Sequence, residues 1–308
     1  MTPEIDRRGF LKCMAWAGTG VVWTVAGGVL SGCELGAGQP KASGHPTRDL
    51  YFVQISDSHI GFRGPANQDV TGTFGQAIQQ IAALPSRPAF VMHTGDLTHT
   101  STADQFDTVK QMLGTIRAGS VFQVPGEHDA AAGDDKAYLA MFGAQSKGTG
   151  YYSFDVNGVH FLALVNSVAT QGMGHLGADQ LDWIRRDLSG LSSETPIVVF
   201  AHVPLFAMYP TWGWSTDDAT QALGMMKRFA AVTCLNGHVH QVMSKVEGNV
   251  TFHTARATAF PQPAPGAAPN PGPLTVPSTQ LHQALGITEA RYTARNGRVA
   301  VIDDPLTP

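Results

Sequence analysis

Five short apolar segments of this chain each end in acidic or histidine residues. Each segment is a run of mostly apolar residues that is followed by turn residues, which predicts a buried β-strand. The five predicted strands are residues 51–55, 89–92, 121–124, 196–200 and 230–235. Amphipathic helices are predicted at residues 71–84, 104–119 and 177–191.

Two predicted hairpins and one further strand complete the pattern. Asn-Gly turn signals lie inside two pairs of apolar runs, at 151–164 and 291–302, and predict a hairpin in each. Another strand is predicted at 249–253, whereas residues 261–277 are rich in Pro, Gly and Ala and predict a loop. His160 lies among apolar neighbours, so we expect a packed strand residue there rather than a metal ligand.

The strand ends contain residue types that bind metal ions. His238 and His240 follow the strand at 230–235, and residues two apart in extended backbone project to the same side. Two imidazoles placed together suit a borderline metal such as zinc, manganese or iron. By the same spacing, Asp57 and His59 can face one site. Taken alone, the histidine pair also fits a surface pair, and the Asp57 segment a strand-to-loop turn.

Similar residues follow the other three strands. They are Asp96, the run Glu127-His128-Asp129, and His202. Gly95-Asp96 by itself is a turn dipeptide, and His128-Asp129 also fits a local turn pair. The signal therefore lies in the order of the whole set rather than in any one member.

In this order the set resembles the calcineurin-like metallophosphoesterase family. The blocks that carry the resemblance are Asp57-x-His59, Gly95-Asp96, Gly126-Glu127-His128-Asp129, His202 and Gly237-His238-x-His240. The resemblance spans residues 51–253. It implies a four-layer α/β/β/α sandwich of two mixed sheets, with a catalytic domain at 49–260. The Pro-rich loop and C-terminal hairpin of residues 261–308 are expected to pack on the same domain.

The resemblance also implies a role for each residue. One metal ion would be bound by Asp57, His59 and His240, and a second by Glu127, His202 and His238. Asp96 would bridge the two ions, which are expected to be divalent or trivalent ions of Mn, Fe or Zn. His128 would act at the leaving group as general acid or charge stabiliser, and Asp129 would orient its imidazole.

Such a site implies hydrolysis of phosphomonoesters or phosphodiesters by metal-bound hydroxide. Two cations about 3.5–4 Å apart neutralise the anionic ester, orient it and activate a water. Glu127 departs from the Asn that is usual in the family, adding negative charge that strengthens cation binding and repels an anionic phosphate. A non-catalytic, metal-bearing binding or scaffold lipoprotein is therefore the alternative.

Two tryptophans between the ligand blocks leave two interpretations open. Trp212 and Trp214 can form a rim over the metal ions and stack on a base or ring of the substrate. Equally, they can pack inside the fold.

The N-terminal segment has the pattern of an export signal. Arg7-Arg8-Gly9-Phe10-Leu11-Lys12 resembles a twin-arginine motif, and Leu30-Ser31-Gly32-Cys33 resembles a lipobox with Cys33 as the lipidated residue. A short membrane anchor or a buried helix is the alternative. Residues 1–33 are thus expected to engage the twin-arginine export machinery, and 34–48 to form a flexible tether. The product would be a periplasmic or cell-envelope lipoprotein, attached to the membrane through a lipid on Cys33.

Composition sets two further limits. The formal net charge of −4 gives no indication of a nucleic-acid scaffold, and an apolar content of 43% argues against disorder. After removal of the signal only Cys33 and Cys234 remain. Because a lipidated Cys33 cannot form a disulfide, stability must come from the core and from bound metals.

Overall fold

The computed structural model of the protein describes residues 23–26, 29–32, 48–131, 135–167 and 172–307. The chain divides into two units, Met1–Lys41 and Ala42–Pro308. In the first unit, β1 (Trp23–Ala26) and β2 (Val29–Gly32) pair antiparallel. The predicted twin-arginine motif and Cys33 lie outside the described residues. Among the described residues, no helix has the length and apolarity needed to span a membrane.

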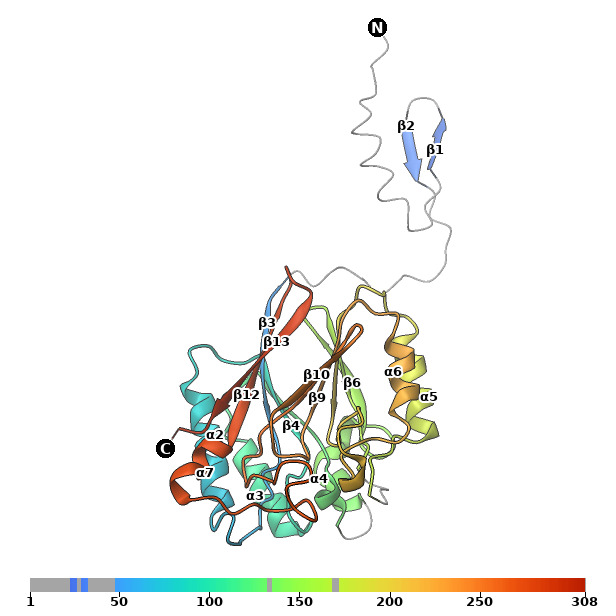
Figure 1. Cartoon of the computed structure of the whole chain (residues 1–308). Helices are drawn as coiled ribbons and strands as arrows, with labels where there is room; N and C mark the ends of the chain where they lie inside the picture. Colours follow the sequence, from blue (N-terminus) through green and yellow to red (C-terminus); the bar gives the residue numbers. More distant parts are fainter. Residues whose placement is uncertain (1–22, 27–28, 33–47, 132–134, 168–171, 308) are drawn as a thin grey trace. The chain divides into compact units, whose positions relative to one another are not determined.

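A five-stranded mixed sheet forms one half of the second unit (Figure 1). Its strands, in spatial order, are β13 (Arg298–Pro305), β12 (Gly286–Thr293), β3 (Leu50–Ile55), β4 (Phe90–Thr94) and β5 (Ser120–Val124). The last three are parallel, whereas the C-terminal hairpin β12–β13 adds to them in antiparallel fashion through β12 and β3. The C-terminal hairpin is therefore part of the same sheet as the first predicted strand.

A six-stranded mixed sheet forms the other half. Its order is β10 (Met243–Glu247), β11 (Val250–Thr254), β9 (Val232–Asn236), β8 (Ile197–Ala201), β7 (Val159–Ala163) and β6 (Tyr152–Val156). The four inner strands are parallel, and the two edge strands run antiparallel to their neighbours.

The two sheets pack face to face through aromatic side chains. The Phe52 ring lies 5.6 Å from that of Phe161 and 5.9 Å from that of Phe200, which belong to the other sheet. Successive residues of a strand face opposite sides, so Val53 packs on the outer side of its sheet while Phe52 packs between the sheets. Strand β3 therefore contributes to two cores, one on each side of its sheet.

Helices cover the outer faces of both sheets. The helices are α2 (Val70–Ala83), α3 (Ala103–Leu113), α4 (Lys136–Phe142), α5 (Ala178–Leu188), α6 (Ala219–Met226) and α7 (Ser278–Ala284). Phe74 of α2 and Phe106 of α3 pack against the five-stranded sheet, while Ile184 of α5 and Ala222 of α6 pack against the six-stranded sheet. The predicted fold class, a four-layer sandwich of two mixed sheets, is confirmed.

Three of the differences from the sequence-based expectation have a clear local reason. The helix expected at 104–119 ends at Leu113, because Gly114, a poor helix former, follows it. In the next turn the backbone hydrogen bonds join residues three apart instead of four, as in Thr115 N–H to Met112 O. Strand β10 was not predicted, since this mostly exposed edge strand lacks an apolar run. Helix α7 has no buried residue and therefore leaves no apolar stripe in the sequence.

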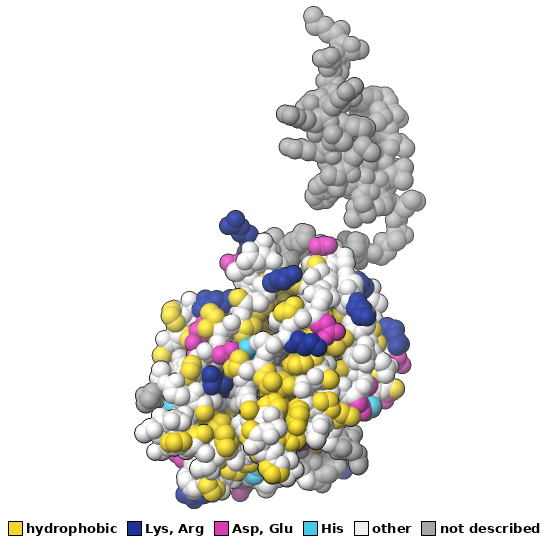
Figure 2. Space-filling view, viewed as in Figure 1, with side chains coloured by type: hydrophobic (Ala, Val, Ile, Leu, Met, Phe, Trp, Pro, Cys, Tyr) yellow, Lys and Arg dark blue, Asp and Glu magenta, His cyan; other side chains and the backbone are white. Residues whose placement is uncertain are grey.

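The face shown in Figure 2 carries mixed charge. Lysine and arginine side chains and aspartate and glutamate side chains are scattered over it, and hydrophobic side chains gather in its lower central part. This view therefore contains no continuous patch of a single charge.

Candidate metal centre

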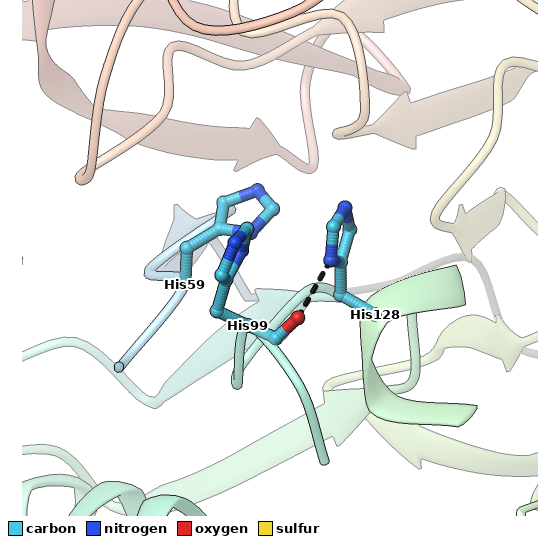
Figure 3. A group of neighbouring side chains, drawn as sticks. All are labelled: His59, His99 and His128. Carbon is cyan, nitrogen blue, oxygen red and sulfur yellow. Dashed lines mark hydrogen bonds between the residues drawn. The ribbon is translucent and has the colours of Figure 1, made fainter. Parts of the chain in front are cut away.

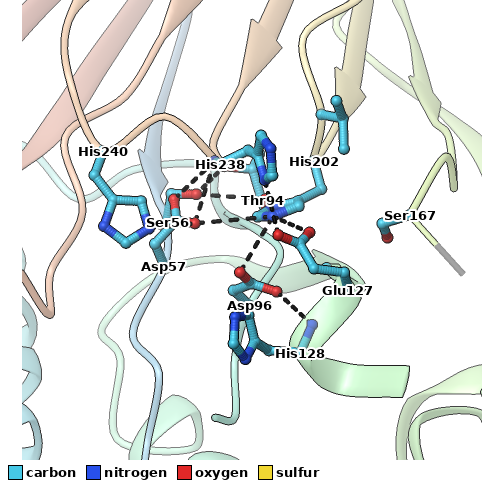
Figure 4. Close-up of polar contacts among 12 residues, drawn as sticks. Ser56, Asp57, Thr94, Asp96, Glu127, His128, Ser167, His202, His238 and His240 are labelled. Carbon is cyan, nitrogen blue, oxygen red and sulfur yellow. Dashed lines mark hydrogen bonds and ion pairs between the residues drawn. The ribbon is translucent and has the colours of Figure 1, made fainter. Parts of the chain in front are cut away.

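The predicted site residues converge at one edge of the sandwich (Figure 4). They lie in the loops that follow β3, β4, β5, β8 and β9. Because the carboxyl ends of parallel strands meet at the same edge of a sheet, five loops that are far apart in sequence come together here. These residues are Asp57, His59, Asp96, Glu127, His128, Asp129, His202, His238 and His240.

The backbone at these loops is unusual. Seven described non-glycine residues have positive φ, and five of them are candidate site residues. These are Asp57 (54°), His59 (41°), Asp96 (50°), His238 (70°) and His240 (53°). The expectation that extended backbone aims each pair at one site is therefore wrong, since β3 ends at Ile55 and β9 at Asn236. Left-handed turns aim these side chains instead, at a cost of about 1–3 kcal/mol each.

Asp57, His59 and His240 form one set of candidate ligands, called here the buried group. One ligand atom from each lies within 4.8 Å of the others. His240 Nε2 is 3.2 Å from Asp57 Oδ1 and 3.3 Å from His59 Nε2. All three residues are at most 2% exposed.

Glu127, His202 and His238 form a second set, called here the open group. Their ligand atoms also lie within 4.8 Å of one another. The Glu127 carboxylate approaches both rings, with Oε2 3.0 Å from His202 Nε2 and Oε1 2.9 Å from His238 Nδ1. His202 is fully buried, but the Glu127 and His238 side chains are 33% and 14% exposed.

Asp96 lies between the two groups. Its Oδ2 atom is 3.4 Å from His59 Nε2 of the buried group and 3.4 Å from His202 Nε2 of the open group. Its Oδ1 atom accepts a hydrogen bond from the His128 backbone N–H. One carboxylate oxygen is thus shared by both groups.

Backbone carbonyls fix the orientation of two of the rings. His202 Nδ1–H donates to Thr94 O at 2.7 Å, and His240 Nδ1–H donates to Phe260 O at 2.6 Å. With the proton on Nδ1, the neutral ring has its lone pair on Nε2, the atom that faces the site. This is the arrangement of a metal-binding histidine.

Several buried polar atoms of the site have no hydrogen-bond partner. They are His202 Nε2, His238 Nε2 and Glu127 Oε2, and the close approach of His202 to Glu127 lacks hydrogen-bond geometry. Buried polar groups are rarely left unpaired, so these atoms fit ligands of a cation. The mixed nitrogen and oxygen donors of both groups suit Mn, Fe or Zn.

The charges of the site also indicate that it can bind a cation. Burial lowers the pKa of His202, but the Asp96 and Glu127 carboxylates outweigh it and raise the pKa well above its usual value. Burial opposes ionisation of Glu127, yet His238 and His202 hold its pKa well below the usual range. The carboxylates therefore require a positive charge beside them. A bound cation would supply that charge in place of a protonated imidazole.

Two glycines allow the loops to approach closely. A Cβ at Gly126 would lie 2.0 Å from Asp96 Oδ1, and one at Gly237 would lie 2.0 Å from Ser56 Oγ and 2.7 Å from Asp57 Oδ2. Any other residue at either position would push a candidate ligand away. This accounts for the glycine in each block.

His128 lies beside the buried group. Its ring centroid is 4.7 Å from that of His59, and Nδ1–H donates to the backbone O of His99 at 2.8 Å. Burial lowers the pKa of His128, but Asp96 and Glu127 outweigh that effect, and the net pKa is raised. A raised pKa suits a residue that donates a proton to a leaving group.

The expectation that Asp129 orients the His128 ring is wrong. The Asp129 carboxylate accepts from the backbone N–H groups of Gly126, Leu97 and Thr98 and from the Thr98 hydroxyl. These donors occupy both of its oxygens, whereas the His128 ring bonds to the loop after β4. Asp129 instead ties the β4 and β5 loops together.

The expectation that Trp212 and Trp214 form a rim over the metal ions is also wrong. Trp214 is fully buried and Trp212 is 8% exposed, and their rings meet edge to face at 5.1 Å. Both pack against Val239, the residue between His238 and His240. They therefore support the His-x-His loop from inside the fold and leave little surface for stacking on a substrate.

Two residues at the site were not predicted from the sequence. His99, three residues after Asp96, contacts both His59 and His128. Phe260 accepts the His240 hydrogen bond and stacks on the His59 ring at 4.8 Å. His99 could have been found from the sequence, because a histidine lies so close to Gly95-Asp96. Phe260 could not, because a single Phe after a strand does not indicate a site.

Curated proteins resemble this chain over most of its length. The family model described as Calcineurin-like phosphoesterase matches residues 50–242. A 3′,5′-cyclic-nucleotide phosphodiesterase from Nostoc sp. is 24% identical over 217 residues, covering 68% of this chain and 79% of that protein. The glycerophosphodiester phosphodiesterase GpdQ from Enterobacter lignolyticus is 24% identical over 257 residues, covering 77% of this chain and 88% of that protein.

A solved structure resembles the fold. A dimetal phosphatase from Danio rerio superposes with a TM-score of 0.60 at 13% identity, covering 84% of this chain and 99% of that chain. At this identity the similarity concerns the fold alone.

Proposed function

Because the chain belongs to the calcineurin-like phosphoesterase family, whose members are metal-dependent phosphoric ester hydrolases, we propose that it is a dinuclear phosphodiesterase. The buried group would hold one ion and the open group the other, and Asp96 would be shared between them. The observation that carries the proposal is the meeting of two complete ligand sets around one shared carboxylate oxygen, 3.4 Å from a histidine of each set.

The residues of the chain have distinct tasks in this reaction. When bound, the two ions neutralise the charge of the ester and activate a water for attack on phosphorus. Glu127 and His238, the exposed members of the open group, lie where an ester reaches the site from solvent. The His128 imidazole, held by the His99 carbonyl, donates a proton to the departing oxygen.

The charge of the site favours diesters over monoesters. Asp57, Asp96 and Glu127 all have pKa values below their usual range, because neighbouring histidines outweigh burial. Their three negative charges leave two divalent ions with one net positive charge. A phosphodiester with one negative charge neutralises this site, whereas a phosphomonoester with two leaves one negative charge uncompensated where burial disfavours charge. Two relatives named as phosphodiesterases support the same choice.

A panel of esters tests the proposal. Purified protein is loaded with Mn, Fe or Zn, its ion content is measured, and hydrolysis of matched aryl phosphate mono- and diesters is followed. We expect two ions per chain and a higher kcat/KM for the diester. Two bound ions without turnover of any ester would instead indicate the non-catalytic scaffold.

We further propose that the protein is exported and anchored through a lipid on Cys33. The motif at Arg7-Arg8 and the lipobox that ends at Cys33 support this. Cys33→Ala is expected to move the protein from the membrane fraction to the soluble fraction, and Arg7→Lys with Arg8→Lys to block export. Unchanged fractionation of the Cys33→Ala protein would contradict lipid anchoring.

A further inference from the structure

His99 contacts two residues of the proposed reaction at once (Figure 3). Its Nδ1 atom is 3.4 Å from Nδ1 of His59, a member of the buried group. Its ring stacks on the His128 ring with centroids 4.8 Å apart and planes 16° from parallel. Its backbone O accepts the hydrogen bond from His128 Nδ1–H at 2.8 Å. The residue therefore links the ligand side of the site to the leaving-group side.

His59 differs from other candidate ligands in its orienting partner. His202 and His240 donate their Nδ1–H groups to backbone carbonyls, which no substitution can remove. The partner of His59 Nδ1 is instead a side chain, that of His99. The orientation of His59, unlike that of His202 or His240, is therefore set by a residue that sequence change can alter.

The direction of the His59–His99 contact follows from metal binding. A ligand that offers its Nε2 lone pair to an ion carries its proton on Nδ1. His59 Nδ1–H must then donate, and His99 Nδ1 must accept. Such outer partners fix the tautomer and the angle of a metal-binding ring, and their loss typically weakens metal affinity about ten- to a hundredfold.

We propose that His99 is a positioning residue with two separable roles. Its Nδ1 atom accepts a hydrogen bond from His59 Nδ1–H and so orients that ligand toward the ion of the buried group. Its ring covers one face of the His128 imidazole and so restricts the position from which the proton is donated. The proposal rests on the dinuclear function proposed above and adds to it which residue connects the first ion to the leaving group.

Two substitutions separate the two roles. His99→Phe keeps an aromatic ring against His128 and Phe62 but removes the acceptor. His99→Asn keeps an acceptor oxygen close to the position of Nδ1 but removes the ring. His253→Phe is the control, because His253, although more buried than His99, is likewise hydrogen-bonded to side chains, and its partners, Ser244 and Asp303, are not candidate ligands.

The readouts are the affinity of each ion, measured by Mn or Zn titration of the metal-free protein, and kcat and KM at saturating metal. We expect His99→Phe to weaken one ion about ten- to a hundredfold and leave the other unchanged, with kcat near wild type. We expect His99→Asn to retain both affinities and to lower kcat severalfold with little change in KM. His253→Phe should match wild type in both.

Three results would overturn the proposal: unchanged affinities in His99→Phe, equal weakening of both ions in a folded protein, or equal weakening by His99→Phe and His99→Asn. Near- and far-ultraviolet circular dichroism establishes that each variant is folded. If the wild type binds two ions but hydrolyses no ester, the proposed function fails. The affinity comparison still decides the acceptor role of His99 in that case.

Discussion

The buried group and the open group differ in how tightly the fold holds them. In the buried group, Asp57, His59 and His240 are almost entirely enclosed, and the His240 ring is tied to Phe260 O. In the open group, Glu127 and His238 are partly exposed, and all three residues contain a buried atom without a hydrogen-bond partner. The fold alone holds the ligands of the buried group together, whereas the open group would depend on a bound cation for its cohesion.

This difference separates two requirements of the proposed reaction. An ion enclosed by packed side chains exchanges slowly and serves as a fixed charge. An ion beside solvent keeps positions open for water and substrate, as catalytic metal sites require. We therefore expect a chelator to remove the ion of the open group first, with the buried ion leaving in a slower second phase.

The most severe test removes the element that both groups share. Asp96→Asn leaves one oxygen to serve two ions and takes a negative charge from between them. We expect about a thousandfold loss of kcat/KM, equivalent to about 4 kcal/mol, and weaker binding of both ions. Steady-state kinetics and metal analysis measure the two effects. Asp217→Asn, at an exposed pair with His175, is the control. Loss of only one ion would mean that Asp96 belongs to a single group.

Removal of the support behind the His-x-His loop should affect the two groups unequally. Trp214→Ala empties the core next to Val239 and is expected to lower the free energy of unfolding by about 3 kcal/mol in urea titrations. His240 is also held by Phe260 O, so the open-group ion, bound by His238, should lose more affinity than the buried ion. Trp183 is a residue of α5 that packs in the core beside the six-stranded sheet, and Trp183→Ala should lower the stability by a similar amount without an effect on metal binding. Equal losses of affinity for both ions would contradict the expectation that the fold holds the buried group more tightly than the open group.

Substitution of Glu127 tests the charge of the open group alone. Glu127→Asn is expected to give a folded, metal-binding protein in which the open-group ion binds roughly ten- to a hundredfold more weakly and the buried ion is unaffected. The ratio of monoester to diester hydrolysis should rise, because one negative charge is gone. Glu127→Gln separates charge from side-chain length. Loss of both metals together with global unfolding would contradict this prediction.

The smallest expected effect comes from a histidine outside both groups. Burial lowers the pKa of His160, but hydrogen bonds to Asp155 and Asp187 outweigh it and raise the pKa to about 9. The charged form is thus stabilised in the folded state, and this stabilisation is complete below pH 6.5, the usual pKa of histidine. It is lost as the pH rises toward 9.

We expect a loss of about 1 kcal/mol across that window, since the Asp155 side chain is largely exposed and its ion pair is screened. Denaturant titrations from pH 6.5 to 9 measure it, with His160→Gln as the control that lacks the slope. Any effect of pH on metal binding must be compared with this change in the free energy of unfolding. If the free energy of unfolding of the wild type changes with pH as little as that of the variant, His160 does not cause the pH dependence.

Much of the fold could be predicted because the information is local. The apolar runs at β3, β4, β5, β8 and β9 appear in the sequence, as do the acidic and histidine residues that follow them. Elements without an apolar pattern, such as β10 and α7, could not be found in this way. The prediction that His160 is packed in a strand agrees with its place in β7, although its two aspartate partners were not foreseen.

The sequence by itself determined which residues end each strand, since hydrophobic periodicity and turn residues act over a few neighbouring positions. The tertiary structure alone decided how those residues are aimed and which of them meet. His59 and His240 are 181 positions apart, and only the packing of two sheets with their parallel strand ends at one edge brings their rings to 3.3 Å. The same packing gives the Asp129 oxygens to backbone N–H groups and buries Trp214, outcomes that depend on competition among partners distant in the chain.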